Sequence, residues 1–544
     1  MPPFKERIIM ALNSLNFLLF LGLVVIIYYA APKKYQWAVL LLASYGFYLS
    51  SGIDHVVYIL FTTIFTFLAG LFMQRLRDKN QQKIDALGEE ASKEEKRELK
   101  KQVQKKVHIV QVVTVLVNLG VLAAIKCLNL VIGGLNDAFA LFKWDASMPF
   151  VNIIVPLGLS YYTFNCIGYL IDLGRGKHPA EKHLGKFALF ASFFPSIVQG
   201  PLFRFNDVGI QLQQPHKLDY NNLKYGAQLI LWGFFKKLVI ADRVAPVART
   251  IFAEGFDYTN GSQVFFGVLM YSFQIYGDFS GGTDITRGAA QMLGIDLPVN
   301  FERPFFATSM ANFWQRWHMS LGAWMREFVF FPVMLCKPVT AISKKFRKRF
   351  GPHAAKMVPS VAAPMVVFFL IGIWHGVTSQ YIVNGLYNAL LISSTVALTP
   401  FYEKLAKWLR INTEAFSWKL FQMLRTFTLL CISRIIVKAP SLGEAFRMIK
   451  TMFSSISLGF LSGKDGLIYT YGIDKANLIV LILAIVVLLV VGILQENGLK
   501  IREALSRQNL VFRWGMILLL LAVVIIFGVY GPEYDASAFI YGRF

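Results

Sequence analysis

The sequence predicts an all-α, polytopic integral membrane protein, because its composition, its apolar stretches and its charge distribution agree. Of its 544 residues, 55% are hydrophobic and only 16% are charged, whereas soluble domains carry about 25% charged residues. This composition disfavours a soluble multidomain enzyme and excludes intrinsic disorder and collagen-like repeats. We expect a single membrane domain over residues 1–544, with a charged insert at 75–107.

Mostly apolar stretches, several of them near the length that a membrane helix needs, recur along the chain. We expect roughly 11–13 transmembrane helices, with re-entrant segments where glycine and proline interrupt the apolar runs. The first stretch is interpreted as a retained anchor, because it is too long for a signal peptide and further spans follow. The stretches cover residues 8–29, 37–49, 56–73, 109–125, 151–170, 229–251, 264–276, 361–373, 381–398, 420–436, 478–494 and 514–530.

The basic excess of the chain indicates which loops face the cytoplasm. Lys and Arg number 55 against 32 Asp and Glu, a formal charge of +23, and cytoplasmic loops of membrane proteins collect such residues. The insert is therefore expected as a solvated, helical, cytoplasmic segment. Basic clusters at 344–349 and 500–513 are placed on the same side, which leaves both termini outside. These clusters could also bind an acidic carrier protein or anionic lipid.

Several kinds of chemistry have no motif in the sequence. There is no P-loop, no dinucleotide-binding glycine motif, no H-E-x-x-H and no G-x-S-x-G. No His/Cys cluster has zinc spacing, so no metal site and no bound cofactor are predicted. The cysteines lie in apolar surroundings without a C-x-x-C pair, which is typical of small buried side chains. They are Cys127, Cys166, Cys336 and Cys431.

Ionisable groups at membrane depth are costly and are therefore functional candidates. The densest set lies in residues 312–332. If this segment is helical, Trp317 and His318 fall on an aromatic stripe with i, i+3, i+4, i+7 spacing. Asn312, Arg316 and Arg326 are then candidates for substrate binding, with the two arginines available for an anion. The alternative is an interfacial amphipathic helix, with its Trp and Arg side chains at headgroup level.

Three other polar sites interrupt apolar runs. His375 follows Trp374 at the end of one run, and a desolvated imidazole stays neutral, as a general base near pH 7 requires. The alternative is a satisfied core histidine. Asp278 and Asp284 could bind a cation, orient a His or Arg, or cap broken helix ends; with Trp374 they are also candidates for substrate binding. The Pro- and Gly-containing segment 194–204 predicts a re-entrant loop or a simple turn.

Together these blocks resemble the membrane-bound O-acyltransferases, in the bacterial branch of alginate O-acetylation and teichoic acid D-alanyl transfer proteins. The sequence departs from the family pattern at Gly282, where tyrosine is usual, and matches it only partly in the tail. The resemblance is carried by residues 155–164, 169–172, 194–204, 233–242, 274–284, 300–301, 313–326 and 374–376.

The resemblance implies a helical bundle, thinned at its centre, with a tunnel that meets at a histidine. His375 matches the essential histidine of the family, and His318 matches a second conserved histidine. The donor is an acyl thioester, acyl-CoA or an acyl carrier protein, on the cytoplasmic side of a bacterial cell membrane. The acceptor lies outside and is often reached through an extracytoplasmic partner protein.

These implications predict an O-acyltransferase that moves an acyl group, acetyl in the favoured version, to hydroxyls of an exported or cell-wall polysaccharide. His375 removes the hydroxyl proton, and His318 orients the substrate or donates to the oxyanion. One alternative is D-alanyl transfer to teichoic acids. The alternative from another class is a transporter or flippase for a lipid-linked sugar.

Overall fold

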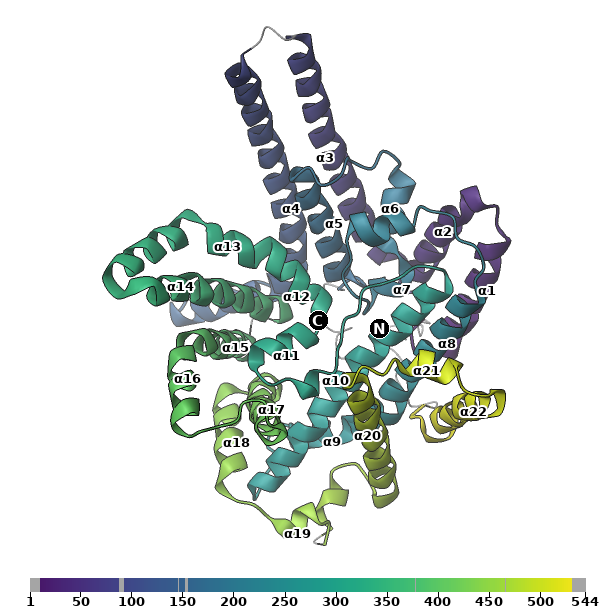
Figure 1. The fold of residues 1–544 in the computed structure, drawn as a ribbon, viewed down its shortest axis with the longest axis vertical. Coiled ribbons are helices and arrows are strands. Elements are labelled where there is room, and N and C mark those ends of the chain that lie inside the picture. Colours follow the sequence, from purple (N-terminus) through teal and green to yellow (C-terminus); the bar gives the residue numbers. More distant parts are fainter. Residues whose placement is uncertain are drawn as a thin grey trace. The chain divides into compact units, whose positions relative to one another are not determined.

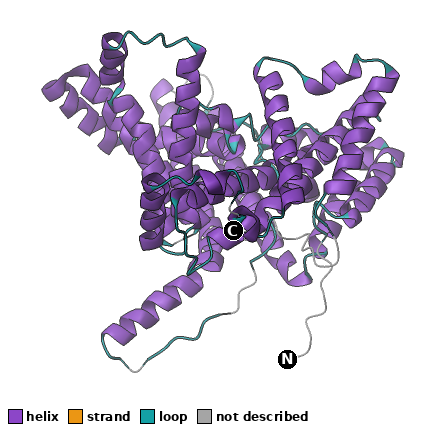
Figure 2. Ribbon diagram, turned by 90° about the horizontal axis from the view of Figure 1, so that it is seen from below, coloured by secondary structure: helices purple, strands orange, loops and turns teal. Residues whose placement is uncertain are grey.

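The computed structural model describes residues 10–87, 92–144, 146–151, 155–376, 378–464 and 466–530. These residues form helices joined by loops (Figure 2), which confirms the expected all-α class. In the described ranges the one β-type pairing is an isolated bridge between Phe301 and Trp317. The chain forms two compact units. The expectation of a single domain stays a prediction, and the tail lies outside the described residues.

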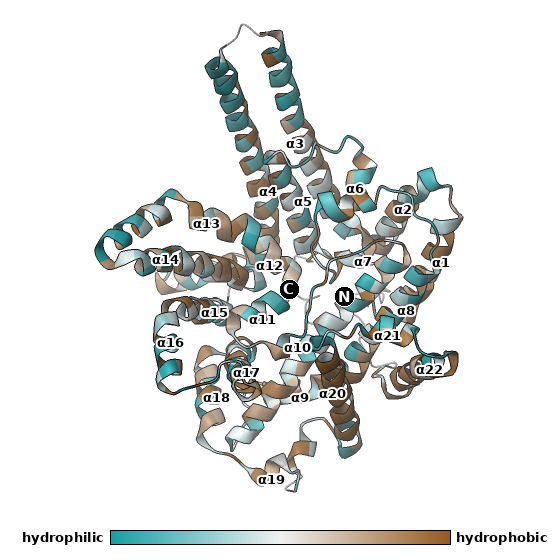
Figure 3. Ribbon diagram, viewed as in Figure 1, coloured by the Kyte–Doolittle hydropathy of each residue, from teal (hydrophilic) through white to brown (hydrophobic). Residues whose placement is uncertain are grey.

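The first unit comprises the described residues up to Gly226 together with Ala289–Pro298. In this unit, α3 and α4 lie side by side as a long helical pair (Figure 1), and the ends that carry the charged insert are hydrophilic (Figure 3). A capping box between Ser92 and Glu95 starts α4, so the described part of the insert is helical, as predicted. The helices are α1 (Leu15–Ala30), α2 (Gln36–Leu49), α3 (Ile53–Ala86), α4 (Lys93–Leu141), α5 (Leu159–Gly174), α6 (Leu184–Ser192) and α7 (Phe194–Ile197).

Segment 194–204 is a short helix, α7, followed by a buried, non-helical stretch in the first unit. Proline at the second helical position and the glycine at 200 explain why the helix is so short. The Arg204 guanidinium lies 2.9 Å from an Asp172 carboxylate oxygen. The expected break in the helix is therefore present, and its basic residue is held by an ion pair.

The second unit comprises Ala227–Gly288 and the described residues from Val299 onwards. Helix α8 (Tyr220–Phe234) enters it, a π-helical segment (Phe235–Ala241) follows, and α10 (Gly261–Met292) leaves it. The other helices are α9 (Asp242–Ile251), α11 (Met310–Arg316), α12 (Met319–Met325), α13 (Phe331–Leu335), α14 (Lys337–His375), α15 (Ser379–Ala397), α16 (Thr399–Trp408), α17 (Phe416–Lys438), α18 (Leu442–Ser454), α19 (Leu458–Leu461), α20 (Lys475–Glu496), α21 (Ile501–Ser506) and α22 (Leu510–Phe527).

Six described helices are long and apolar enough to cross a membrane, or seven if the bent pair α15 and α16 is one span. The six are α3, α4, α14, α17, α20 and α22, and the apolar character of α20 and α22 is plain in Figure 3. The stretch 264–276 lies within the long helix α10, and the stretch 229–251 contains the π-helical segment. Residues 8–9 and 152–154 of the predicted stretches lie outside the described residues. The total of roughly 11–13 spans stays a prediction.

Helices α14 and α15 form the close antiparallel hairpin that positions the candidate site. Two glycines make this approach possible. A Cβ on Gly372 would lie 2.7 Å from the Tyr381 carbonyl oxygen, and a Cβ on Gly385 would lie 2.4 Å from that of Phe368. Because real Cβ atoms do not come this close, any larger residue would push the hairpin apart. Helix α15 also packs against α11 and α17.

Candidate active site

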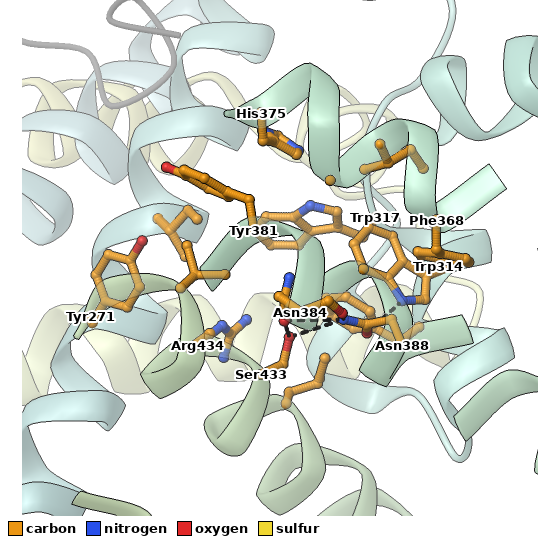
Figure 4. Close-up of a pocket in the computed structure, with 17 residues that line it drawn as sticks. Tyr271, Trp314, Trp317, Phe368, His375, Tyr381, Asn384, Asn388, Ser433 and Arg434 are labelled. Atoms are coloured by element: carbon orange, nitrogen blue, oxygen red, sulfur yellow. Dashed lines mark hydrogen bonds between the residues drawn. The ribbon is translucent and has the colours of Figure 1, made fainter. Parts of the chain in front are cut away.

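A cavity of about 90 Å³ lies in the second unit, where His375 ends α14. Residues of α10, α11, α14, α15 and α17 line it together with Trp317, and Figure 4 shows ten of them labelled. By this measure a water molecule needs about 10–15 Å³, so the cavity has room for a small group. It is the natural place for a reaction that needs a histidine.

Aromatic rings surround the histidine. Trp374 and Tyr381 lie 4.6 Å and 6.0 Å from the His375 ring, centroid to centroid, and Tyr381 is stacked on it. Trp317 and Trp314 form another wall of the cavity (Figure 4). Trp317 is 5% exposed and belongs to the apolar core that joins α10, α11 and α17. These aromatic side chains therefore enclose the imidazole on several sides.

The segment around His318 is a break between two short helices and not the single helix that the stripe pattern requires. Helix α11 ends at Arg316, and α12 begins at Met319. Between them Trp317 pairs with Phe301, and His318 takes a left-handed conformation with φ 47°. The stripe expectation was therefore wrong, because backbone pairing with residues 300–302 replaces the helix at this point.

His318 is held in one tautomer by Asn300. The Ser320 backbone N–H, which can only donate, lies 3.1 Å from Asn300 Oδ1, and the Ser320 hydroxyl donates to the same atom at 2.9 Å. That atom is therefore the amide oxygen, an acceptor. His318 Nδ1 lies 3.1 Å from it and must carry the hydrogen. Nε2 of neutral His318 is then a hydrogen-bond acceptor.

Burial keeps His318 neutral. Its side chain is 4% exposed, and the Phe279 ring meets it edge-on with 4.7 Å between centroids. Desolvation has the larger effect on the pKa of His318 and the nearby His375 the smaller; together they lower it to about 3. The second effect means that the two histidines lie close enough to repel as cations. The residues that line the cavity include His375 and Trp317, the neighbour of His318 in the chain, but not His318 itself.

The opposite wall of the cavity is polar. Asn384 and Asn388, one turn apart on α15, join Ser433 of α17 in a hydrogen-bonded group (Figure 4). Arg434 lines the cavity beside them and is 7% exposed. Its guanidinium donates to the Ser272 hydroxyl at 2.5 Å. A positive charge therefore lines the same cavity as His375.

The chain is similar to known acyltransferases. The profile described as MBOAT, membrane-bound O-acyltransferase family, matches residues 179–434. A probable alginate O-acetylase of Azotobacter vinelandii is 30% identical over 441 residues, which are 80% of this chain and 76% of that protein. The chain belongs to the membrane-bound O-acyltransferase family. This confirms the resemblance, and the protein is a multi-pass membrane O-acyltransferase whose substrate includes an acyl donor.

Two further relatives of this acyltransferase differ in their acyl group. A probable alginate O-acetylase of Pseudomonas syringae pv. tomato is 29% identical over 441 residues, 80% of this chain and 73% of that protein. A teichoic acid D-alanyltransferase of Bacillus subtilis is 31% identical over 266 residues, 48% of this chain and 64% of that protein. Both histidines lie within the part matched by the family profile.

The structure places the two candidate arginines of this acyltransferase away from the cavity lining. Arg316 makes a two-pronged contact with Glu496 at the end of α20, at 2.9 and 3.0 Å. Arg303 shares the same carboxylate at 2.5 Å. Arg326 is exposed at the start of a π-helical segment (Arg326–Phe330). The ion pair that Arg316 makes fastens the histidine-bearing segment to α20.

Asn312 and Trp374 have local roles in the structure. The Asn312 backbone N–H donates to the Ser309 hydroxyl at 3.1 Å, which caps α11. Trp374 packs directly beside His375 but does not line the cavity. Of the predicted binding residues, Trp317 is the one that the structure places in the cavity wall with His375.

Asp278 and Asp284 lie inside the uninterrupted helix α10 and form buried ion pairs with the π-helical segment. Lys237 Nζ lies 2.6 Å from Asp278 and 2.9 Å from Asp242. Lys236 Nζ lies 2.7 Å from Asp284. The expectation that these polar residues cap broken helix ends was wrong, because α10 continues through them and the lysines supply their partners.

Sequence reasoning missed Asn300, Asn384, Ser433 and Arg434. The last three lie in stretches that were interpreted only as spans, 381–398 and 420–436. Polar residues inside such spans are themselves a signal, because an apolar environment penalises them unless they are partnered or functional. Asn300 gave a weaker signal, since its partner His318 is distant in sequence and becomes a neighbour only through the backbone pairing.

Proposed function

We propose that this acyltransferase moves an acetyl group from a cytoplasmic thioester, acyl-CoA or an acyl carrier protein, to hydroxyls of an exported or cell-wall polysaccharide. The observation that carries the proposal is the small cavity lined by His375 at the end of α14. A two-carbon acyl group is small enough to fit it. The alginate O-acetylases also align over a larger share of this chain than the D-alanyltransferase does.

The two histidines have different roles in the proposed transfer. His375 removes the proton of the acceptor hydroxyl as its oxygen attacks the thioester carbonyl, and later returns the proton to the leaving thiolate. His318 Nε2 accepts a hydrogen bond from the substrate and so orients it, because its Nδ1 hydrogen is held by Asn300. Neutral His318 has no hydrogen left for an oxyanion. Of the two roles considered for His318, orientation therefore has the stronger support.

Arg434 supports a neutral acyl group over D-alanyl. A D-alanyl thioester carries an ammonium group next to its carbonyl, and Arg434 would oppose it in a cavity of low polarity. An acetyl group carries no charge and meets no such penalty. D-alanyl transfer to teichoic acids remains the second candidate, since it is the activity that the name of the Bacillus subtilis relative states.

The proposed sidedness follows the charge pattern. The basic ends of α3 and α4 and the cluster at 344–349 face the cytoplasm, where the thioester is made. Both termini lie outside, and an extracytoplasmic partner protein passes the acyl group to the polymer. The plasma membrane of a bacterium is the setting, and the relatives named above come from bacteria.

The test is acetyl thioester turnover by the full-length protein in lipid nanodiscs, followed as release of free thiol. His375→Ala should lower turnover by a factor on the order of 10²–10⁴. His353→Ala is the matched control, because it removes an exposed histidine from the same helix. Full turnover by the His375 variant would end the proposal, as would an absence of wild-type turnover with every acetyl thioester tried.

A further inference from the structure

A relay of hydrogen bonds fixes the direction of one amide beside the cavity. It begins at Trp314, whose indole N–H can only donate and which lies 3.1 Å from Asn388 Oδ1. The other end of that amide is therefore Nδ2, which lies 2.8 Å from the Asn384 carbonyl oxygen, 3.2 Å from Asn384 Oδ1 and 3.2 Å from Ser433 Oγ. The Ser433 hydroxyl also donates to Asn384 Oδ1, at 2.6 Å. Two donors thus converge on the oxygen of the Asn384 amide.

The Asn384 amide nitrogen consequently points away from Ser433 and Asn388. Asn384 lines the same cavity as His375, and Figure 4 shows this nitrogen on the side toward Tyr381 and His375. It donates no hydrogen bond to any of the described residues. Asn388 is fully buried and Ser433 is 7% exposed, so water does not compete for the contacts that hold the amide. The nitrogen is a preorganised donor in a small, mostly apolar chamber.

We infer that Asn384 Nδ2 donates to the oxyanion that forms on the acyl carbonyl during transfer, an inference that rests on the proposed function. As the acceptor oxygen bonds to the carbonyl carbon, the π pair moves onto the carbonyl oxygen and the hydroxyl proton moves to His375. When the C–O double bond reforms, the carbon–sulfur bond breaks and the thiolate takes the proton from His375. The donor is already in place, so no reorganisation opposes the step.

The assignment also resolves which group supplies the oxyanion contact. His318 is unsuited, because Asn300 holds its one ring hydrogen. The amide of Asn384 is neutral, and its N–H groups face the cavity whatever the protonation state of the histidines. Removing one such donor from an oxyanion site typically lowers kcat by about 10²–10³.

The experiment compares Asn384→Asp, Asn384→Leu and wild type in the nanodisc turnover assay. Asn384→Asp keeps an oxygen for Ser433 and Asn388 but removes the N–H donors, so the relay survives while the donor is lost. We expect kcat to fall about 10²–10³-fold with KM unchanged, because the contact forms only in the transition state. Asn384→Leu removes the same donors without adding a charge and should lose kcat to a similar degree.

A kcat within threefold of wild type in either variant would overturn the inference, while His375→Ala separately reports on the proposed function. If neither variant can be purified folded, Ser433→Ala loosens one of the two contacts that orient the amide. It should lower kcat several-fold with KM unchanged, and an unchanged kcat would overturn the inference. Asn412→Leu, at a residue outside the cavity lining, controls for the substitution itself.

Discussion

Asn300 offers the sharpest test of how His318 works. Its Oδ1 receives hydrogen bonds from His318 Nδ1 and from the backbone N–H and hydroxyl of Ser320, and Asn300 is 1% exposed. At about 1 kcal/mol for each hydrogen bond, Asn300→Ala should destabilise the protein by about 3 kcal/mol. It also frees His318 to rotate and to change tautomer, so turnover should fall on the order of 10- to 100-fold.

Asn300→Asp separates orientation from charge. The carboxylate still accepts the His318 Nδ1 hydrogen but stabilises the imidazolium, so the pKa of His318 should rise from about 3 toward its usual value. The protonated ring cannot accept through Nε2. Turnover by Asn300→Asp should therefore fall as the pH is lowered through the raised pKa and recover at higher pH. In the wild type, His318 stays neutral across this range and adds no such acid limb.

The assay is kcat against pH from about 5 to 9 in nanodiscs, with melting temperatures recorded at each pH. Asn497→Ala and Asn497→Asp at the exposed end of α20 serve as controls. Two results would refute the reasoning. One is an Asn300→Ala variant that folds and keeps wild-type turnover. The other is an Asn300→Asp variant whose pH profile matches that of the wild type.

Two other predictions concern buried charges. Asp278→Ala removes one of the carboxylates that pair with Lys237, so we expect a loss of about 3 kcal/mol, seen as a lower melting temperature. Glu414→Ala at an exposed pair should change nothing, and an equal effect of both variants would contradict this. Arg434→Met removes a cation from the cavity. The ratio of acetyl to D-alanyl thioester turnover should then fall about tenfold or more, with the acetyl rate as the internal reference; an unchanged ratio would contradict the role of Arg434 as a charge filter.

Much of the architecture could be predicted because membrane helices have a strong periodic and compositional signature. The helical insert and the spans α3, α4, α14, α17, α20 and α22 all follow from apolar length and charge. The positions at which helices are interrupted were harder to predict. Nothing local in residues 312–332 shows that Trp317 would pair with Phe301, because that pairing joins segments that a helical pattern treats separately. The same pairing decides the conformation of His318.

The sequence predicted only part of the candidate site, for a related reason. His375 and His318 are conspicuous because an imidazole in an apolar run needs an explanation. Asn384 and Ser433 are not conspicuous, since each is a common polar residue within a helix and their partnership arises from the packing of α15 on α17. Arg316 was conspicuous but was predicted to bind substrate. Its charge suggested an anionic ligand, whereas its partner in the structure is Glu496, which lies 180 residues away in the sequence.

Two hydrogen-bonded arrangements orient the reactive groups, one at His318 and one at Asn384, and both use neutral amides. In each, one donor of unambiguous identity sets the direction of an asparagine: the backbone N–H of Ser320 for Asn300, and the indole N–H of Trp314 for Asn388. A carboxylate could hold His318 more strongly, but burying another charge here would cost several kcal/mol and would favour the imidazolium. Amide dipoles fix the tautomer of His318 and the aim of Asn384 without that charge. The small, mostly apolar cavity can therefore present a directed donor to an oxyanion, while His318 beside it stays neutral.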